Sequence, residues 1–304
     1  MAHYNLAIAL RANGETDPAI AHYRQAVALR PDYAEARYNL GRLLVEKGQL
    51  NEAIAHYEKA LSVNPADAEA HNNLGIALLR IGRDDEALVH YQKALAIQPD
   101  YADASCNLAS ALLSKGDMDG AIDHYLAGLA RSPNYAEAQY NVANALLRKG
   151  RIDEAIDHYQ KALELQPDNA DADTNLGSAF LEKGRPQDAI AQYRHALQVA
   201  PENVAAQSNL AWQLATSSDP SLRNGPEALR LAERANRLSG GNRPVVLHIL
   251  AAAYAETGRF VEAKAAAQQA LQAADNQGNS VLADTLRDEI VLYDLGLPYH
   301  KEAK

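Results

Sequence analysis

The sequence predicts an all-α fold, a solenoid of stacked helix-turn-helix hairpins, and three observations support this prediction. Prolines and glycines each recur every 34 residues, and a fixed period of this length is typical of repeat proteins. Each period holds two stretches of apolar residues at helical spacing. Ala and Leu, which favour helices, supply most of the apolar residues. The two series are Pro31, Pro65, Pro99, Pro133, Pro167, Pro201 and Gly14, Gly48, Gly82, Gly116, Gly150, Gly184.

One period, residues 34–67, indicates how each hairpin is built. Its first half places apolar side chains on one helical face, and Gly48 then ends the helix, because glycine adopts the left-handed cap without a Cβ penalty. Asn51 is predicted to cap the second helix, and Pro65 ends the unit. In other periods we expect the same cap from Asp17, Asp85, Asp119 and Asp153. The two apolar faces are Ala36, Leu40, Leu43, Leu44 and Ala53, Tyr57, Ala60, Leu61.

The period organises the whole chain of 304 residues into one predicted solenoid. Residues 216–228 are rich in Ser, Pro, Gly and Asn, and we interpret them as a longer turn inside the seventh unit. Residues 280–296 predict a terminal helix that caps the last hairpin. The units are about 1–33, 34–67, 68–101, 102–135, 136–169, 170–203, 204–243 and 244–277.

The second unit resembles the tetratricopeptide repeat, whose pattern it matches at Leu40, Gly41, Leu44, Ala53, Tyr57 and Pro65. The departures are regular, since Leu replaces the first Tyr of the pattern and Tyr replaces its Phe. This resemblance implies a right-handed α-solenoid superhelix whose first helices line a concave surface. It also implies a role in protein–protein interaction rather than in catalysis.

Composition narrows the classes of partner and of compartment. The net charge is −10 and the pI about 5.5, which disfavours nucleic acid and anionic membranes as partners. No apolar run is long enough to cross a bilayer, and the N-terminal residues lack signal-peptide features. We therefore expect a cytoplasmic protein, or a periplasmic or membrane-tethered one where the natural chain is longer. The C-terminal part resembles the ends of bacterial multi-repeat proteins, which implies a bacterial source.

Residues that could carry chemistry are sparse, and we predict no enzymatic activity, no cofactor and no metal. Nucleotide-binding, metalloprotease and hydrolase motifs are missing from the sequence. A histidine column precedes the core tyrosines, but residues 34 apart lie in successive hairpins, too far apart to share one ion. We interpret it as a half-exposed face, and Cys106 as a packing residue. The column is His22, His56, His90, His124 and His158.

An asparagine column points to binding, because asparagine is a poor choice inside a helix and the core does not require it. We expect its carboxamides to hydrogen-bond the backbone of an extended peptide in the concave groove. The spacing between hairpins would match about three residues of such a peptide. The alternative is that each Asn bonds the neighbouring hairpin and holds the superhelix; the two are compatible. Tyr38, Tyr140, Arg42, Arg80, Arg148 and Trp212 are the other predicted groove residues. The column is Asn5, Asn39, Asn73, Asn107, Asn141, Asn175 and Asn209.

This column is similar to that of the superhelical repeats of O-linked N-acetylglucosamine transferase, and the resemblance implies binding of extended polypeptide. The sequence thus predicts a non-catalytic scaffold that binds peptide or protein segments of unknown identity. Two alternatives stay open. One is a substrate-recruiting region of a larger glycosyltransferase-like enzyme, and the other is a structural repeat that self-associates. Self-association would use the N-terminal end, where the first helix begins without a cap.

Overall fold

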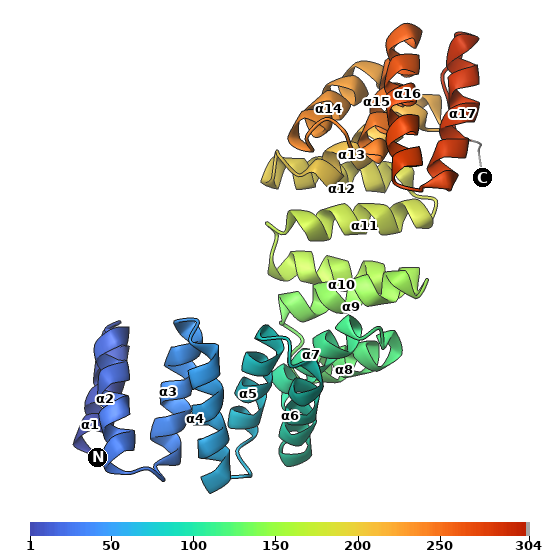
Figure 1. The fold of residues 1–304 in the computed structure, drawn as a ribbon. Coiled ribbons are helices and arrows are strands. Elements are labelled where there is room, and N and C mark those ends of the chain that lie inside the picture. The colour runs from blue at the N-terminus through green and yellow to red at the C-terminus, as the bar shows by residue number, and fades with distance from the viewer. Residues whose placement is uncertain (302–304) are drawn as a thin grey trace. The chain divides into compact units, whose positions relative to one another are not determined.

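The fold consists of α-helices, as the sequence predicts. A computed structural model describes residues 1–301 and contains, within this range, seventeen α-helices, one short 3-10 helix and no strand (Figure 1). Within each part of the chain described below, consecutive helices pack against each other, which confirms the prediction of an all-α solenoid of hairpins. The chain divides into two compact units, Met1–Lys149 and Gly150–Lys304, which are described separately as unit 1 and unit 2. The predicted grouping of all residues into one solenoid of eight units stays a prediction.

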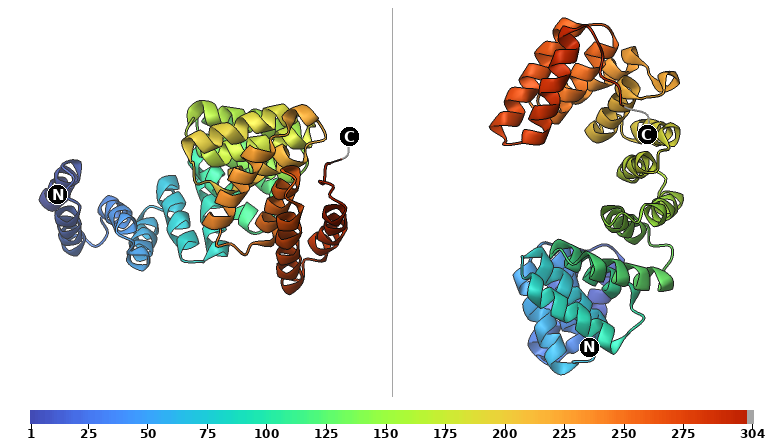
Figure 2. Two further views of the ribbon diagram at one scale, coloured as in Figure 1. Left: turned by 90° about the horizontal axis from the view of Figure 1, so that it is seen from above. Right: turned by 90° about the vertical axis from the view of Figure 1, so that its right-hand side faces the viewer.

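Unit 1 is made of regular hairpins, seen from further sides in Figure 2. Every helix packs on the next one along the chain, and some first helices also contact the first helix of the following hairpin. The helices are α1 (Ala2–Ala12), α2 (Thr16–Leu29), α3 (Ala34–Glu46), α4 (Leu50–Val63), α5 (Ala68–Arg80), α6 (Asp84–Ile97), α7 (Ala102–Ser114), α8 (Met118–Arg131) and α9 (Ala136–Arg148).

Unit 2 begins with the same hairpins and ends differently. The short helix η1 (Pro220–Leu222) lies between α13 and α14, within the stretch expected to be a longer turn. The last helix, α17, packs on α16. The helices are α10 (Ile152–Leu165), α11 (Ala170–Glu182), α12 (Pro186–Val199), α13 (Val204–Thr216), α14 (Gly225–Leu238), α15 (Pro244–Glu256), α16 (Phe260–Asn276) and α17 (Ser280–Asp294).

Glycines and tyrosines at fixed places set the hairpin geometry. Gly48 has a φ of 75°, and this left-handed conformation lets the chain leave α3 and enter α4 within a few residues. The core tyrosines are almost fully buried. A Cβ on Gly75 would lie 2.6 Å from the ring of Tyr91, so glycine lets the ring pack directly on the backbone of α5. The tyrosines are Tyr23, Tyr57, Tyr91, Tyr125, Tyr159 and Tyr193.

The predicted caps of the second helices are wrong. Asp17 and Asn51 are each the second residue of their helix, because the short glycine turn lets the helix begin two residues earlier than expected. The acidic residues at this position bind a lysine from the following hairpin instead. The pairs are Lys47–Asp17 at 2.6 Å, Lys115–Asp85, Lys149–Asp119 at 2.9 Å and Lys183–Asp153 at 2.6 Å. All four pairs are solvent-exposed, so each contributes little to stability.

Candidate functional site

The predicted asparagines lie on the first helices of their hairpins. Asn5 is exposed, and the other six are half-buried: Asn39, Asn73, Asn107, Asn141, Asn175 and Asn209. A half-buried carboxamide is held by its surroundings and is still reachable from solvent, which is the exposure that a binding side chain needs.

In unit 1 the asparagines bond from one hairpin to the next. The Asn39 amide donates to the Tyr4 hydroxyl at 3.3 Å, and the Asn73 amide donates to the Tyr38 hydroxyl at 2.9 Å. The Asn107 amide donates to the carboxamide oxygen of Asn72 at 2.9 Å. Each bond joins residues 35 apart and therefore links neighbouring first helices. We call these six residues, Tyr4, Tyr38, Asn39, Asn72, Asn73 and Asn107, the asparagine stripe.

Tyr38 connects the asparagine stripe to a carboxylate. Its hydroxyl donates to the Glu69 carboxylate at 3.0 Å while it accepts from Asn73. Burial and the bond to Glu69 raise the pKa of Tyr38 well above its ordinary value, so the hydroxyl keeps its proton and stays a donor. The guanidinium of Arg42 lies 5.8 Å from the Tyr38 ring centre. The ring is therefore fixed from both sides.

The asparagines of the later hairpins contact core tyrosines. Burial raises the pKa of the Tyr125 hydroxyl, and hydrogen bonds from Ser110 and Asn141 partly offset this shift. Tyr193 is affected in the same way by Ser178 and Asn209. Here the carboxamide holds a first helix against the second helix of the preceding hairpin.

These bonds leave part of the carboxamides unused. The three amides of Asn39, Asn73 and Asn107 each use one donor on the neighbouring hairpin. Within residues 1–301, the structure gives their carbonyl oxygens no partner. A carboxamide oxygen can accept two hydrogen bonds. The asparagine stripe can therefore offer a row of acceptors to the N–H groups of a bound chain.

The other predicted groove residues have separate environments. Arg80 and Arg148 are exposed at the ends of α5 and α9, and Tyr140 is half-buried on α9. Trp212 packs on two other aromatic rings. Its ring lies 4.8 Å from that of His248 and 6.0 Å from that of Tyr299, in the segment after α17.

A second column, two residues before each asparagine, carries contacts that the sequence did not reveal. Its side chains differ, but several bond the carbonyl of the proline six residues earlier. Arg37 reaches Pro31 at 2.6 Å, Gln139 reaches Pro133 at 2.9 Å and Gln207 reaches Pro201 at 2.6 Å. The shared task is visible only in the structure, because Arg, His and Gln have little else in common apart from an N–H donor.

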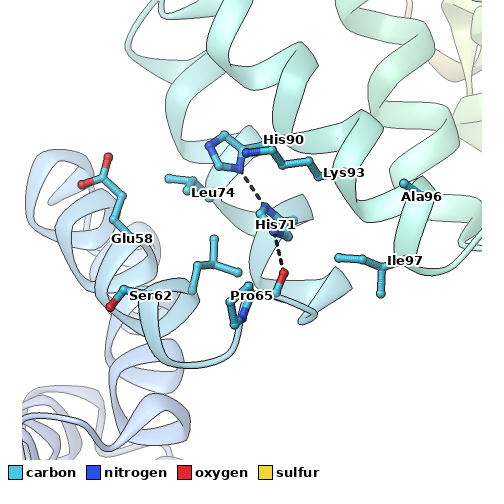
Figure 3. A pocket seen from close by; sticks show the side chains of 10 residues that line it. Glu58, Ser62, Pro65, His71, Leu74, His90, Lys93, Ala96 and Ile97 are labelled. Atoms are coloured by element: carbon cyan, nitrogen blue, oxygen red, sulfur yellow. Dashed lines mark hydrogen bonds between the residues drawn. The ribbon is translucent and has the colours of Figure 1, made fainter.

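Two members of this second column are histidines, and each pairs with a histidine of the column that precedes the core tyrosines. His3 and His22 approach to 3.0 Å between their Nδ1 atoms, and His71 and His90 to 2.8 Å. His71 also donates from Nε2 to the Pro65 carbonyl at 3.2 Å, so its Nδ1 must accept the proton of His90 (Figure 3). These two rings line a pocket of about 510 Å³ between α4 and α6. Burial and the neighbouring His71 lower the pKa of His90 to about 4, so the pair is neutral at pH 7.

Chemistry beyond hydrogen bonding finds little support in the described part of the chain. Residues 1–301 contain no group of three or more His, Cys, Asp or Glu side chains able to hold a metal ion. Cys106 is buried, and burial raises the pKa of its thiol to about 12, so no thiolate forms at neutral pH. No described helix is both long and apolar enough to cross a membrane.

Comparison with known proteins agrees with the hairpin geometry. The TPR repeat model matches residues 7–44 and 41–82. Tetratricopeptide repeat models match residues 68–101, 100–168, 134–202 and 244–269. No curated protein matches the chain. The matches run without a break from residue 7 to residue 202.

Solved structures of repeat proteins resemble the chain as well. MamA is 30% identical over 54% of this chain and 96% of its own, with a TM-score of 0.50. YrrB, described as a TPR protein with an unusual peptide-binding site, is 24% identical over 60% of this chain and 95% of its own, with a TM-score of 0.54. PilF of Pseudomonas aeruginosa is 22% identical over 74% of this chain and 98% of its own, with a TM-score of 0.61. At these identities YrrB and PilF support the fold alone.

The repeated hairpins and the polar row on their first helices define a helical-repeat protein of the scaffold class. The family models make the assignment specific: the chain belongs to the tetratricopeptide repeat family.

Proposed function

We propose that the chain is a non-catalytic scaffold that binds an extended peptide or protein segment along the predicted asparagine groove. The observation that carries the proposal is the unbroken contact of the asparagine stripe from α1 to α7. Its side chains are fixed by their neighbours, so a ligand meets ordered acceptors and little side-chain freedom is lost on binding. The acceptors lack side-chain specificity, because any peptide unit supplies an N–H group.

Spacing supports an extended ligand. Packed helices lie about 8–10 Å apart, and an extended chain advances about 3.3 Å per residue. One carboxamide can therefore meet about every third peptide residue. Each such hydrogen bond contributes about 0.5–1.5 kcal/mol net, so three of them contribute a few kcal/mol before ordering costs.

The test begins with a displayed library of random 12-residue peptides selected against the full chain. Selected peptides are then titrated against the variant Asn39→Ala/Asn73→Ala/Asn107→Ala. We expect at least about tenfold weaker binding, since each bond lost to the peptide contributes about 1 kcal/mol. The melting temperature should fall by several degrees, because each asparagine also loses its bond to the neighbouring hairpin, but the chain should stay folded. The matched control is Gln25→Ala/Lys59→Ala/Gln92→Ala, which changes three exposed residues on α2, α4 and α6. Equal affinity of both variants for every selected peptide would contradict the proposal.

Self-association is a second candidate, and one observation favours it. Leu6 on α1 is 45% exposed, whereas its counterparts Leu40 and Leu74 are 0% and 1% exposed in their hairpins. Ile8, also on α1, is 45% exposed too. The side of α1 that is covered in later hairpins is therefore open to another helix. Light scattering of wild type and Leu6→Glu/Ile8→Glu tests this candidate: a dimer lost in the variant supports it, and a monomer in both opposes it.

A further inference from the structure

The segment after α17 returns to the first helices of unit 2. Residues 297–301 leave α17, and the main-chain N–H of Lys301 donates to the carbonyl of Thr216 at 2.9 Å. Thr216 is the last residue of α13, where the carbonyl groups have no partner within the helix. The segment therefore supplies a hydrogen bond that the helix end lacks, as a bound peptide does.

Two side chains of the segment meet the predicted groove residue Trp212. The Tyr299 ring stacks on the indole at 6.0 Å, with an interplanar angle of 26°. The Lys301 ammonium lies 5.6 Å from the Trp212 ring centre and donates to the side-chain oxygen of Gln213 at 3.3 Å. A cation here also faces the negative end of the α13 dipole. An aromatic residue and a lysine two positions later thus bind one ordered surface.

The surroundings hold this surface in place. Glu256 accepts from His300 at 2.7 Å and pairs with Arg223 at 3.3 Å. Trp212 also packs against His248, whose Nε2 bonds the buried Glu289 carboxylate at 2.8 Å. We call Trp212, Gln213, Thr216 and Glu256 the tail site. A site whose side chains are fixed from behind loses little freedom when it binds.

The space and the charge around the tail site indicate which kind of ligand it can bind. A pocket of about 1010 Å³ lies beside the segment, lined by the turn between α11 and α12, by Gln213 and by the segment itself. The segment therefore fills only part of the available room. The site presents the negative end of α13, and Glu256, which Arg223 already pairs, still accepts from His300 of the segment. The whole chain carries a net charge of −10. Each of these features favours a basic ligand.

We propose that the tail site binds an extended protein segment in which an aromatic residue is followed two positions later by a lysine or arginine. The chain's own residues 297–301 occupy the site in cis and compete with that partner. This proposal rests on the proposed function only in its class of partner, because the tail site contains none of the asparagine stripe. A tethered segment acts at an effective concentration on the order of millimolar, so it excludes weak partners and yields to strong ones.

The experiment uses the full chain and a labelled synthetic peptide with the sequence of residues 297–304. Fluorescence anisotropy measures its affinity for wild type and for Tyr299→Ala/Lys301→Ala, in which the cis contacts are removed. We expect the variant to bind the peptide at least tenfold more tightly. Adding Trp212→Ala to the variant should weaken binding at least tenfold again. Equal affinity of wild type and the tail variant, or full binding without Trp212, overturns the proposal.

Two further measurements keep the result unambiguous. Val291→Ala changes an exposed residue of α17, outside the segment, and should leave the wild-type affinity unchanged. Trp212 is the only tryptophan of the sequence, so its emission reports the cis contact directly. We expect Lys301→Ala and Tyr299→Ala to shift this emission to longer wavelength; unchanged emission in both overturns cis occupancy. The alanine variant of Asn39, Asn73 and Asn107 should bind the peptide as wild type does, which separates this test from that of the asparagine stripe.

Discussion

Unit 1 and unit 2 treat the same helix face differently. In unit 1 the asparagine stripe is bonded from hairpin to hairpin through its amide donors. In unit 2 residues 297–301 contact Trp212, and α17 is joined to α15 by the buried hydrogen bond between His248 and Glu289. The comparison separates the two proposals: the asparagine stripe of unit 1 is proposed to bind a partner directly, and the tail site of unit 2 to bind one in competition with residues 297–301.

The largest expected effect concerns Glu289, which joins the last helix of unit 2, α17, to α15. Glu289 accepts from both His248 and Tyr293, and its side chain is 2% exposed. Glu289→Ala leaves two buried donors, His248 and Tyr293, without their shared acceptor and should lower the free energy of unfolding by about 3 kcal/mol. Urea denaturation measures the change. The control is Asp294→Ala, which removes an exposed ion pair with Lys264 and should cost less than about 1 kcal/mol. Similar losses in both variants would show that the buried pair does not hold α17.

A smaller effect is expected in the pH dependence of stability, which the histidine pair His71–His90 of unit 1 should influence. The pKa of His90 is about 4 in the folded chain and lies near 6.5 in the unfolded one, so only the unfolded state binds the proton between these values. The contribution of neutral His90 to the free energy of unfolding is thus fully present above pH 6.5 and is lost as the pH falls towards 4. His90→Gln removes this titration. We expect the melting temperature of wild type to fall by a few degrees more than that of the variant between pH 7 and pH 4.5; parallel curves would contradict this.

The sequence predicted the periodic part of the molecule well. Gly48 and Pro65 mark helix ends as expected, because a recurring residue identifies a backbone requirement that one copy cannot. The helix starts were missed, since an Asp or Asn two residues into a helix looks like a cap. Asp17 shows that the acidic side chain instead binds Lys47 of the next hairpin.

Contacts that occur once were beyond prediction. His248 and Glu289 are 41 residues apart, and Lys301 reaches Gln213 across 88 residues, so no period connects them. Trp212 was placed on the groove face from its register alone, but its stacking on Tyr299 depends on how the chain returns after α17. The paired histidines were missed for a related reason: residues were compared only within one column, and the partners lie in two.

A modest effect is expected for a single residue of the asparagine stripe. Asn73→Ala removes one neutral, half-buried hydrogen bond to Tyr38 and should lower the free energy of unfolding by about 1 kcal/mol or less. Chemical denaturation measures it. A loss above about 2 kcal/mol would mean that the stripe serves the superhelix rather than a ligand.

The smallest effect is expected for the lysines that join neighbouring hairpins. Lys47→Ala in unit 1 and Lys183→Ala in unit 2 each remove one exposed ion pair and should change the free energy of unfolding by less than about 1 kcal/mol. Equal small values would show that the periodic frame is alike in both units. A large loss at one lysine only would break that equivalence.

The central claim, that the asparagine stripe holds an extended peptide, can be measured at the side chains themselves. The side-chain amide signals of Asn39, Asn73 and Asn107 can be followed by NMR while a selected peptide is added to the full chain, with Gln25 and Gln92 as internal references. The account predicts that the three asparagine signals shift together and saturate at one peptide per chain, while the glutamine signals stay in place. Asparagine signals that do not move when the peptide is fully bound would contradict it.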